Sequence, residues 1–383
     1  MGRPIPCMLV RGGTSKGVYL DERDLPAKGQ ARDELVLSIF GSPDTRQIDG
    51  LGGADPLTSK VCLIGPPPTQ GAYAGTTDIS YTFGQVSIDE ALVDYRGLCG
   101  NLTAGVGVYA LWAGLVQPAA PVTSVRIYNT NLGRQLTCEV PVEDGRPLEV
   151  GDYVVPGVPG SGAKITVDFS DTGGGATGAL LPTGNTIDTL DVPGVGQVEA
   201  SLVDIGNAHV FVRAADLDLT GTETAAEIDA DQTLCERLET IRAHAAHAMG
   251  MVEDPERALA QSLAVPMLAL VAPPQDYRNV SGEETVSAER CDLLARLMFM
   301  QQAHKAYAAT STVCTGVASR LCGTVVNEVC ERREETPWCV RIGHPAGVVE
   351  TETVIERGSD SVIVKRATLG RTARRLMEGI VFV

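Results

Sequence analysis

The chain has 383 residues and a formal net charge of −17, so it is long enough for two domains or for one large fold built from two similar halves. Hydrophobic residues make up 44 %, charged residues 21 % and aromatic residues 4 %, with 42 glycines, a composition typical of a globular, turn-rich protein. The acidic charge would repel a phosphate backbone, and the scarcity of aromatics leaves few platforms for base stacking, which argues against nucleic acid as a partner.

The sequence shows no feature of a membrane, secreted or metal-binding protein. It contains no run of about 18 apolar residues, and its start lacks the apolar core of a secretory signal. Its ten cysteines include no CxxC or CxxH spacing, which favours reduced thiols over a disulfide framework. We therefore expect a cytoplasmic protein without a metal site or a membrane partner.

The first element is a strand, a glycine turn and a second strand over residues 4–20. The turn reads RGGTSKG, residues 11–17. Its glycines let the backbone approach a ligand, and Thr14, Ser15 and Lys16 offer donors suited to a carboxylate. The alternative is a plain hairpin turn with a solvated lysine.

A lysine stands at the start of the next buried-looking segment. Residues 24–40 contain an amphipathic helix that is predicted to end at Gly41, and an apolar strand follows over 61–64. Lys60 precedes this strand directly. Either its ammonium reaches solvent, or burial lowers its pKa toward neutrality and makes it a base.

Residues 97–113, GLCGNLTAGVGVYALWA, place a thiol where a buried helix is expected to begin. The first turn of a helix has unpaired N–H groups and the positive end of the macrodipole, which favour an anion and lower the pKa of a thiol. Cys99 is therefore a candidate acid/base, and Gly100, Asn101 and Leu102 are candidate anion-binding residues. The alternative is that Cys99 fills space and Asn101 caps the helix.

The second half is predicted to contain strands over 202–212 and 265–271 and helices over 229–249 and 286–302. The first of these strands echoes the glycine turn and strand near the N-terminus. The turn between the second strand and the second helix contains Arg278, a weaker anion-binding candidate.

A second echo suggests an internal repeat. Residues 310–318, TSTVCTGVA, resemble the Cys99 segment. Matching residues 104–106 to 315–317 places Thr310 where Cys99 stands, and a different register would offer Cys314 instead. Two such halves predict pseudo-twofold symmetry, with domains over 1–190 and 191–383. A return of the last strands to the first domain is the alternative.

Three motifs in this order, RGGTSKG (11–17), GSPDTRQIDGLGGADPLTSK (41–60) and CGN (99–101), resemble the PrpF family of allylic isomerases. The resemblance implies an α+β, diaminopimelate-epimerase-like fold with two pseudo-symmetric β-barrel-like domains, each wrapped around a central helix. It also implies a 1,3-proton shift in a small unsaturated di- or tricarboxylate, without cofactor or metal. The second motif is most similar to the 4-oxalomesaconate tautomerases, with 2-methylaconitate, methylitaconate and aconitate isomerases as close relatives.

The resemblance assigns the family's catalytic lysine to Lys60 and its cysteine to Cys99. The residues expected to bind substrate are Thr14, Ser15, Lys16, Gly100, Asn101, Leu102, Arg278, Thr310, Ser311 and Thr312. An amino-acid epimerase or racemase, which would need a second thiol facing Cys99, is one alternative, and a non-catalytic binding protein is another. An exposed barrel edge would be compatible with a homodimer.

Overall fold

The computed structural model describes residues 2–282, 284–331, 335–358 and 362–383. The chain divides into two compact units, Met1–Val167 with Gly370–Val383 (unit 1) and Asp168–Leu369 (unit 2). The first division falls earlier in the chain than the expected boundary between residues 190 and 191. Among the described residues, none of the helices is long and apolar enough to cross a bilayer.

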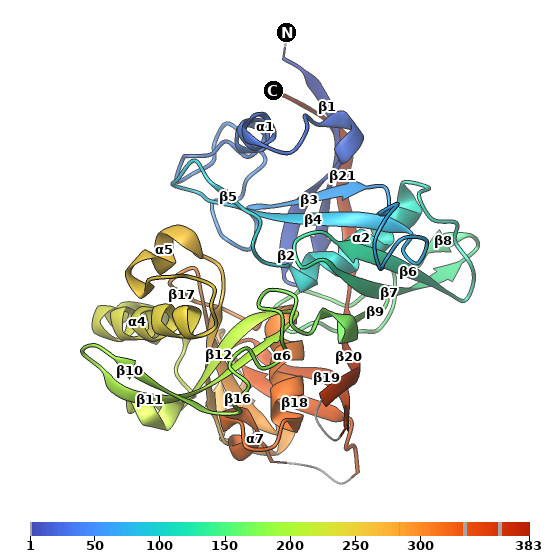
Figure 1. Ribbon diagram of the computed structural model, residues 1–383. Helices are drawn as coiled ribbons and strands as arrows, with labels where there is room; N and C mark the ends of the chain where they lie inside the picture. The colour runs from blue at the N-terminus through green and yellow to red at the C-terminus, as the bar shows by residue number, and fades with distance from the viewer. Residues whose placement is uncertain (1, 283, 332–334, 359–361) are drawn as a thin grey trace. The chain divides into compact units, whose positions relative to one another are not determined.

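Unit 1 is built on a sheet with the strand order β21, β1, β2, β3, β4, β6, β7. The first and last strands of the chain, β1 and β21, pair near the two termini (Figure 1). The strands of unit 1 are β1 (Pro4–Gly12), β2 (Ser15–Asp21), β3 (Lys60–Gly65), β4 (Ile79–Val86), β5 (Val93–Asp94), β6 (Val122–Asn129), β7 (Arg134–Glu143), β8 (Arg146–Pro147), β9 (Ile165–Asp168) and β21 (Ala373–Phe382).

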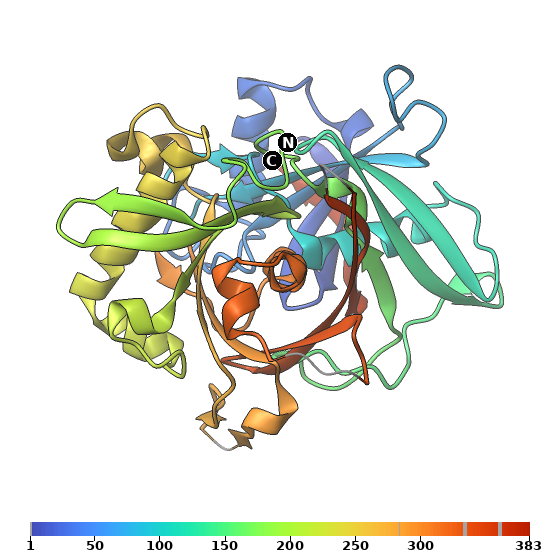
Figure 2. The ribbon, with the colours of Figure 1, turned by 60° about the horizontal axis from the view of Figure 1, so that its bottom comes forward.

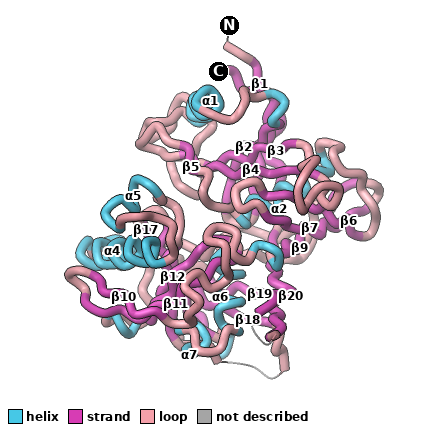
Figure 3. The backbone as a smooth tube through the Cα atoms, in the orientation of Figure 1, coloured by secondary structure: helices cyan, strands magenta, loops and turns pink. Residues whose placement is uncertain are grey.

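Helix α2 (Gly100–Trp112) is the centre of unit 1. It contacts β1, β2 and β21 as well as β6 and β7, so the sheet curves around it (Figure 3). Every residue of α2 except Trp112 is buried, which explains why its sequence is apolar or small on all sides. Helix α1 (Gln30–Phe40) packs Val36, Ile39 and Phe40 into the core of the same unit.

Unit 2 repeats this plan around helix α6 (Ala309–Arg320), which Figure 2 shows nearly end-on in orange with strands curving around it. Its strands are β10 (Asp188–Val192), β11 (Gly196–Ile205), β12 (Asn207–Arg213), β13 (Met267–Ala272), β14 (Tyr277–Arg278), β15 (Thr285–Val286), β16 (Leu293–Phe299), β17 (Gln302–Ala303), β18 (Cys339–His344), β19 (Gly347–Arg357) and β20 (Val362–Arg371), whose last two residues belong to unit 1. Its other helices are α3 (Ala225–Ala230), α4 (Gln232–Ala248), α5 (Ala258–Gln261) and α7 (Val325–Val329).

The two units have the same strand pairing. In unit 1, β1–β2 is antiparallel, β2–β3 parallel, β3–β4 antiparallel, β4–β6 parallel and β6–β7 antiparallel. In unit 2, β11–β12, β12–β13, β13–β16, β16–β18 and β18–β19 follow the same alternation. The predicted α+β class, with a sheet around a central helix in each half, is confirmed.

The register of the repeat differs from the prediction. Cys99 caps α2 and Ala308 caps α6, and in both helices a threonine hydroxyl donates to the cap carbonyl, Thr103 to Cys99 at 3.0 Å and Thr312 to Ala308 at 2.9 Å. Ala308 therefore matches Cys99, and the registers that placed Thr310 or Cys314 there are wrong. A helix that is buried on all sides has no periodic polar face that fixes its alignment.

The helix predicted over 286–302 is also wrong. Residues Leu293–Phe299 form β16, which pairs with β13 on one side and β18 on the other. Leucine, alanine and methionine favour helices, but a strand with neighbours on both sides is selected by burial and ladder hydrogen bonds rather than by propensity. The short α7 was not anticipated.

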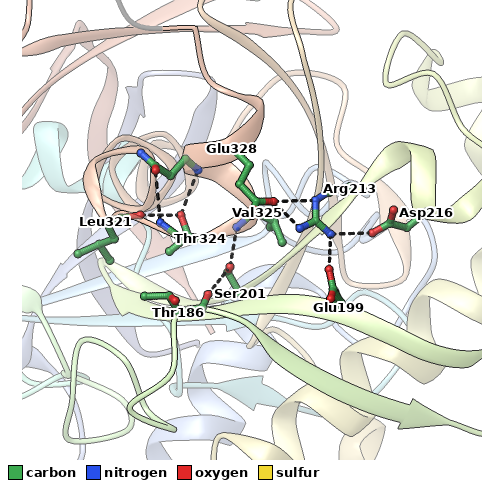
Figure 4. A network of polar contacts seen from close by, with 11 residues as sticks. Thr186, Glu199, Ser201, Arg213, Asp216, Leu321, Thr324, Val325 and Glu328 are labelled. Carbon is green, nitrogen blue, oxygen red and sulfur yellow. Dashed lines mark hydrogen bonds and ion pairs between the residues drawn. The ribbon is translucent and has the colours of Figure 1, made fainter.

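A polar network on unit 2 joins β11, β12, the turn after β12 and α7 (Figure 4). Arg213 pairs with Glu199 at 2.9 Å, with Asp216 at 3.1 Å and with Glu328. At the start of α7, the Thr324 hydroxyl accepts from the Asn327 N–H at 3.1 Å. Such caps satisfy helix N–H groups that have no intrahelical partner.

Candidate active site

The glycine turn of unit 1 lies directly against the start of α2. A Cβ at Gly12 would lie 2.4 Å from the Asn101 carbonyl oxygen, and one at Gly13 would lie 2.2 Å from Asn101 Oδ1. Gly13 also has a positive φ of 49°. Glycine is therefore required at these positions for the turn to reach the helix, and the turn carries Thr14 and Ser15 to the same place.

Asn101 is oriented by two neighbours. Arg371 Nε donates to Asn101 Oδ1 at 2.8 Å, and Asn101 Nδ2 donates to Thr14 Oγ1 at 3.1 Å. Since a guanidinium can only donate, the Asn101 oxygen must face Arg371 and its amide nitrogen must face Thr14. Thr14 accepts here and keeps its own hydroxyl proton for another acceptor.

Cys99 lies at the N-cap of α2 and is 8 % exposed. The first intrahelical bond runs from the Thr103 N–H to the Cys99 carbonyl at 3.0 Å, so the N–H groups of Gly100, Asn101 and Leu102 precede the helical ladder. The thiol is 3.9 Å from the Ser15 hydroxyl. A thiol, a hydroxyl and a helix N-terminus thus occupy one small region of unit 1.

Lys60 is the first residue of β3 and is 3 % exposed. Its ammonium donates to Gln85 Oε1 at 2.5 Å, while the Gln85 amide nitrogen donates to the carbonyls of Pro56 and Ser59 at 3.1 and 3.0 Å. Burial lowers the pKa of Lys60, and the negative charge of a Cys99 thiolate acts in the opposite direction. The two groups are therefore within electrostatic range of each other, and the neutral Gln85 oxygen is one acceptor of the Lys60 ammonium.

Gln85 and Arg371 are the polar residues of this site that sequence reasoning missed. Gln85 lies inside β4, where a polar residue in a buried strand was the available signal. Arg371 is 2 % exposed, and burial lowers its pKa to about 10. It stands at the end of β20, in an arginine-rich segment near the C-terminus that gave no local sign of a buried site.

The start of α6 in unit 2 carries a second buried polar cluster. The His209 ring contacts the Asn207 carbonyl through Nδ1 at 2.9 Å and the Ser311 hydroxyl through Nε2 at 2.7 Å, and Thr310 accepts from the Asn207 amide at 3.1 Å. Because a carbonyl only accepts, Nδ1 carries the ring proton and Ser311 donates to Nε2. Burial lowers the pKa of His209 to about 4, so the ring is neutral.

The remaining predicted residues have other surroundings. The Lys16 backbone N–H donates to the Leu57 carbonyl at 2.9 Å, and the Leu102 carbonyl accepts from the Tyr19 hydroxyl at 2.7 Å. Arg278 is exposed on the separate hairpin of β14 and β15, outside both clusters. The described part of the chain contains no group of three His, Cys, Asp or Glu side chains able to hold a metal ion.

Comparison with known proteins identifies the class and the family. The chain is 49 % identical over 99 % of its length, and 97 % of the relative's, to the 3-methylitaconate isomerase of Eubacterium barkeri. It is 40 % identical to the 2-methyl-aconitate isomerase of Shewanella oneidensis, over 98 % of this chain and 95 % of that one, and 37 % identical to the 4-oxalomesaconate tautomerase of Pseudomonas putida, over 99 % and 96 %. The protein is thus an isomerase that moves a double bond. Residues 3–383 match the model described as PrpF protein, and the chain belongs to the PrpF family.

Solved structures agree with this assignment. A crystal structure of methylitaconate-delta-isomerase matches with a TM-score of 0.82 and 48 % identity, over 100 % of this chain and 96 % of that one. A hydroxyproline epimerase from Agrobacterium vitis shares the fold with a TM-score of 0.56 at 10 % identity, over 100 % and 94 %. The predicted relation to the epimerase-like fold is confirmed.

Proposed function

We propose that this isomerase shifts a double bond in a small unsaturated di- or tricarboxylate by a 1,3-proton transfer in which Lys60 is the base. The observation that carries the proposal is the state of Lys60, which is buried, donates to the Gln85 oxygen, has a lowered pKa and lies within electrostatic range of Cys99. A lowered pKa increases the fraction of lysine in its neutral form, which is the form that can take a proton from the substrate.

The chemistry follows from the arrangement at the start of α2. Neutral Lys60 removes a proton from the allylic carbon, so that a C–H bond breaks, an N–H bond forms and the electron pair enters a dienolate. The N–H groups of Gly100, Asn101 and Leu102 would stabilise the oxygen on which charge develops. Protonation at the far end of the three-carbon unit, by Lys60 itself or by the Cys99 thiol, completes the shift without a net change in composition. On the thiol route, transfer of a proton from the Lys60 ammonium to the Cys99 thiolate restores both groups.

Carboxylate binding is assigned to donors within each unit, taken separately. Thr14, Ser15 and Lys16 would hold one carboxylate in unit 1. In unit 2, Thr310, Ser311 and Thr312 remain predicted carboxylate-binding residues. The N–H groups of Thr310 and Ser311 precede the helical ladder, whereas the N–H and the hydroxyl of Thr312 both donate to the Ala308 carbonyl, at 2.8 and 2.9 Å. The Ser311 hydroxyl contacts acceptors within the protein, His209 Nε2 at 2.7 Å and Met267 Sδ at 3.4 Å, so its backbone N–H is the donor left for a ligand.

The substrate is proposed from the names of relatives. We rank 3-methylitaconate and 2-methylaconitate first because the relatives at 49 % and 40 % identity bear those activities in their names, with 4-oxalomesaconate as the alternative from the relative at 37 %. A two-thiol racemase is disfavoured, since Ala308 occupies the position in α6 that matches Cys99, and the Cys314 thiol contacts the Val203 carbonyl within unit 2.

The test is an NMR time course in deuterated water with these three compounds as separate substrates. The wild-type protein should isomerise one of them with deuterium uptake, and Lys60→Ala should do neither. Lys28→Ala, which removes an exposed lysine, is the matched control and should keep full activity. Isomerisation by folded Lys60→Ala at the wild-type rate would refute the role of Lys60, and no turnover of any of the three would refute the substrate class.

Cys99→Ser separates the two routes for returning the proton. If Cys99 protonates the far carbon, this variant should lose isomerisation but still exchange the substrate's allylic proton with solvent through Lys60. Cys322→Ser, at an exposed cysteine, is the control. Unchanged isomerisation in Cys99→Ser would assign both transfers to Lys60.

A further inference from the structure

Arg371 is a buried cation placed where a cation is unfavourable. It is 2 % exposed and bonded to Asn101, the second residue of α2. The first turn of a helix carries partial positive charge and attracts anions, so a guanidinium there is repelled rather than stabilised. Removing an unpaired charge from water is costly, and a bound anion would offset that cost.

The protein itself supplies no such anion. In the described ranges of the chain, the two acceptors of Arg371 are Asn101 Oδ1 at 2.8 Å and the Gly370 carbonyl at 2.9 Å, both of them neutral. The ionisable groups that act on it are Tyr153 and Cys99, and neither is a carboxylate. Of the other buried arginines, Arg242 pairs with Glu239 at 2.6 Å, whereas Arg296 donates to the carbonyls of Glu223, Ala295 and Gly343.

The neighbours of Arg371 add donors around the same point. Asn101 joins Arg371 to Thr14, whose hydroxyl proton remains available. Asn101 also lies in the first turn of α2, whose backbone N–H groups are further donors. A buried guanidinium, a hydroxyl and helix N–H groups are together the donor set of a carboxylate site.

We propose that Arg371 binds a carboxylate of the substrate at the start of α2 and thereby restricts the enzyme to substrates with a carboxylate beside the reacting carbons. This inference rests on the proposed isomerase function and adds the residue that selects the anionic group. The guanidinium offers two parallel N–H groups to the two carboxylate oxygens, a geometry that lysine cannot reproduce. Without a bound carboxylate, the positive charge of Arg371 has no anionic partner. The ligand-free enzyme is therefore less stable than the complex.

The test measures binding without turnover. Propane-1,2,3-tricarboxylate is saturated and cannot isomerise, so calorimetric titration with it reports affinity alone. Arg371→Gln should bind it about 10- to 100-fold more weakly than wild type, as expected for the loss of charge-assisted hydrogen bonds. Arg374→Gln removes the same formal charge from an exposed neighbour and should bind like wild type.

A second measurement separates binding from a structural role. Without ligand, Arg371→Gln should unfold at the wild-type temperature or above it, and saturating tricarboxylate should raise that temperature less than in wild type. Equal affinity of wild type and Arg371→Gln for the tricarboxylate would overturn the proposal. An Arg371→Lys variant that binds the tricarboxylate like wild type but unfolds at a much lower temperature would also overturn it, because the role of Arg371 would then be structural. If affinity falls as expected while neither protein isomerises any of the three substrates, the proposed reaction is wrong and the anion site stands.

Discussion

Replacing His209 by glutamine should remove a defined part of the protein's acid sensitivity. His209 is fully buried, is stacked on Phe211 with ring centroids 5.6 Å apart, and is hydrogen-bonded to Ser311 as a neutral ring. Burial lowers its pKa to about 4, against about 6.5 for a histidine in an unfolded chain. As the pH falls below 6.5, the unfolded state takes up a proton that the folded state does not, and the free energy of unfolding decreases.

The magnitude follows from these two values. Above pH 7.5 both states are neutral at this position and the contribution vanishes. Between pH 7.5 and pH 5 the wild type should lose about 2 kcal/mol through His209, and the loss should level off near 3 kcal/mol below pH 4. Glutamine does not titrate, so His209→Gln should lack this part of the slope even if its stability at pH 7.5 is lower.

Urea denaturation followed by circular dichroism at pH 7.5, 6 and 5 measures the difference. The quantity of interest is the change in free energy of unfolding between pH values, wild type minus variant. His247→Gln, at an exposed histidine of α4, serves as the control and should retain the wild-type slope. Parallel pH dependences for wild type and His209→Gln would refute the argument that burial holds this ring neutral.

Three further substitutions test other contacts. Gln85→Leu removes the acceptor that stabilises the charged form of Lys60, so the pKa of Lys60 should fall further. The acidic limb of the pH profile of kcat/KM should then move to lower pH, and an unmoved limb would contradict Lys60 as the base. Gly107→Ala would place a Cβ 2.5 Å from Cys138 Cβ and should lower the free energy of unfolding, measured by urea denaturation, by about 1–3 kcal/mol. An unchanged free energy of unfolding would show that β7 can move away to make room for the methyl group. Arg213→Ala should lower stability by about 1 kcal/mol at low salt and less at high salt, and a salt-independent loss would point to packing rather than to its three carboxylates.

Much of the site could be predicted from local sequence signals. The glycines of the turn at residues 11–17, the thiol before a uniformly apolar helix and the lysine before a buried strand each stand out against their neighbours. The structure brings the turn and the helix start together, with Asn101 bonded to Thr14 and Cys99 beside Ser15. These features are visible because a reactive or flexible residue at the boundary of an element has few purely structural reasons to be there.

The residues that were missed depend on partners far away in the chain. Arg371 bonds to Asn101 across 270 positions, and His209 bonds to Ser311 across 102. No local pattern distinguishes a buried arginine or histidine from an exposed one, since burial is decided by segments that the sequence does not place side by side. Gln85 is nearer to Lys60, at 25 positions, but only the β3–β4 pairing shows that the two side chains meet.

The sequence by itself indicated the lysine, cysteine and glycine-turn candidates and the duplicated plan, because these are carried by residue type and by position at element boundaries. The α+β class and the family followed from the resemblance of its three motifs. The tertiary structure decided that Leu293–Phe299 is a strand and that Ala308 corresponds to Cys99. It also decided the surroundings of Lys60 and Arg371. The physical reason is that strand pairing, helix register and the charge state of a buried group are set by contacts between distant segments, whose energies outweigh local propensity.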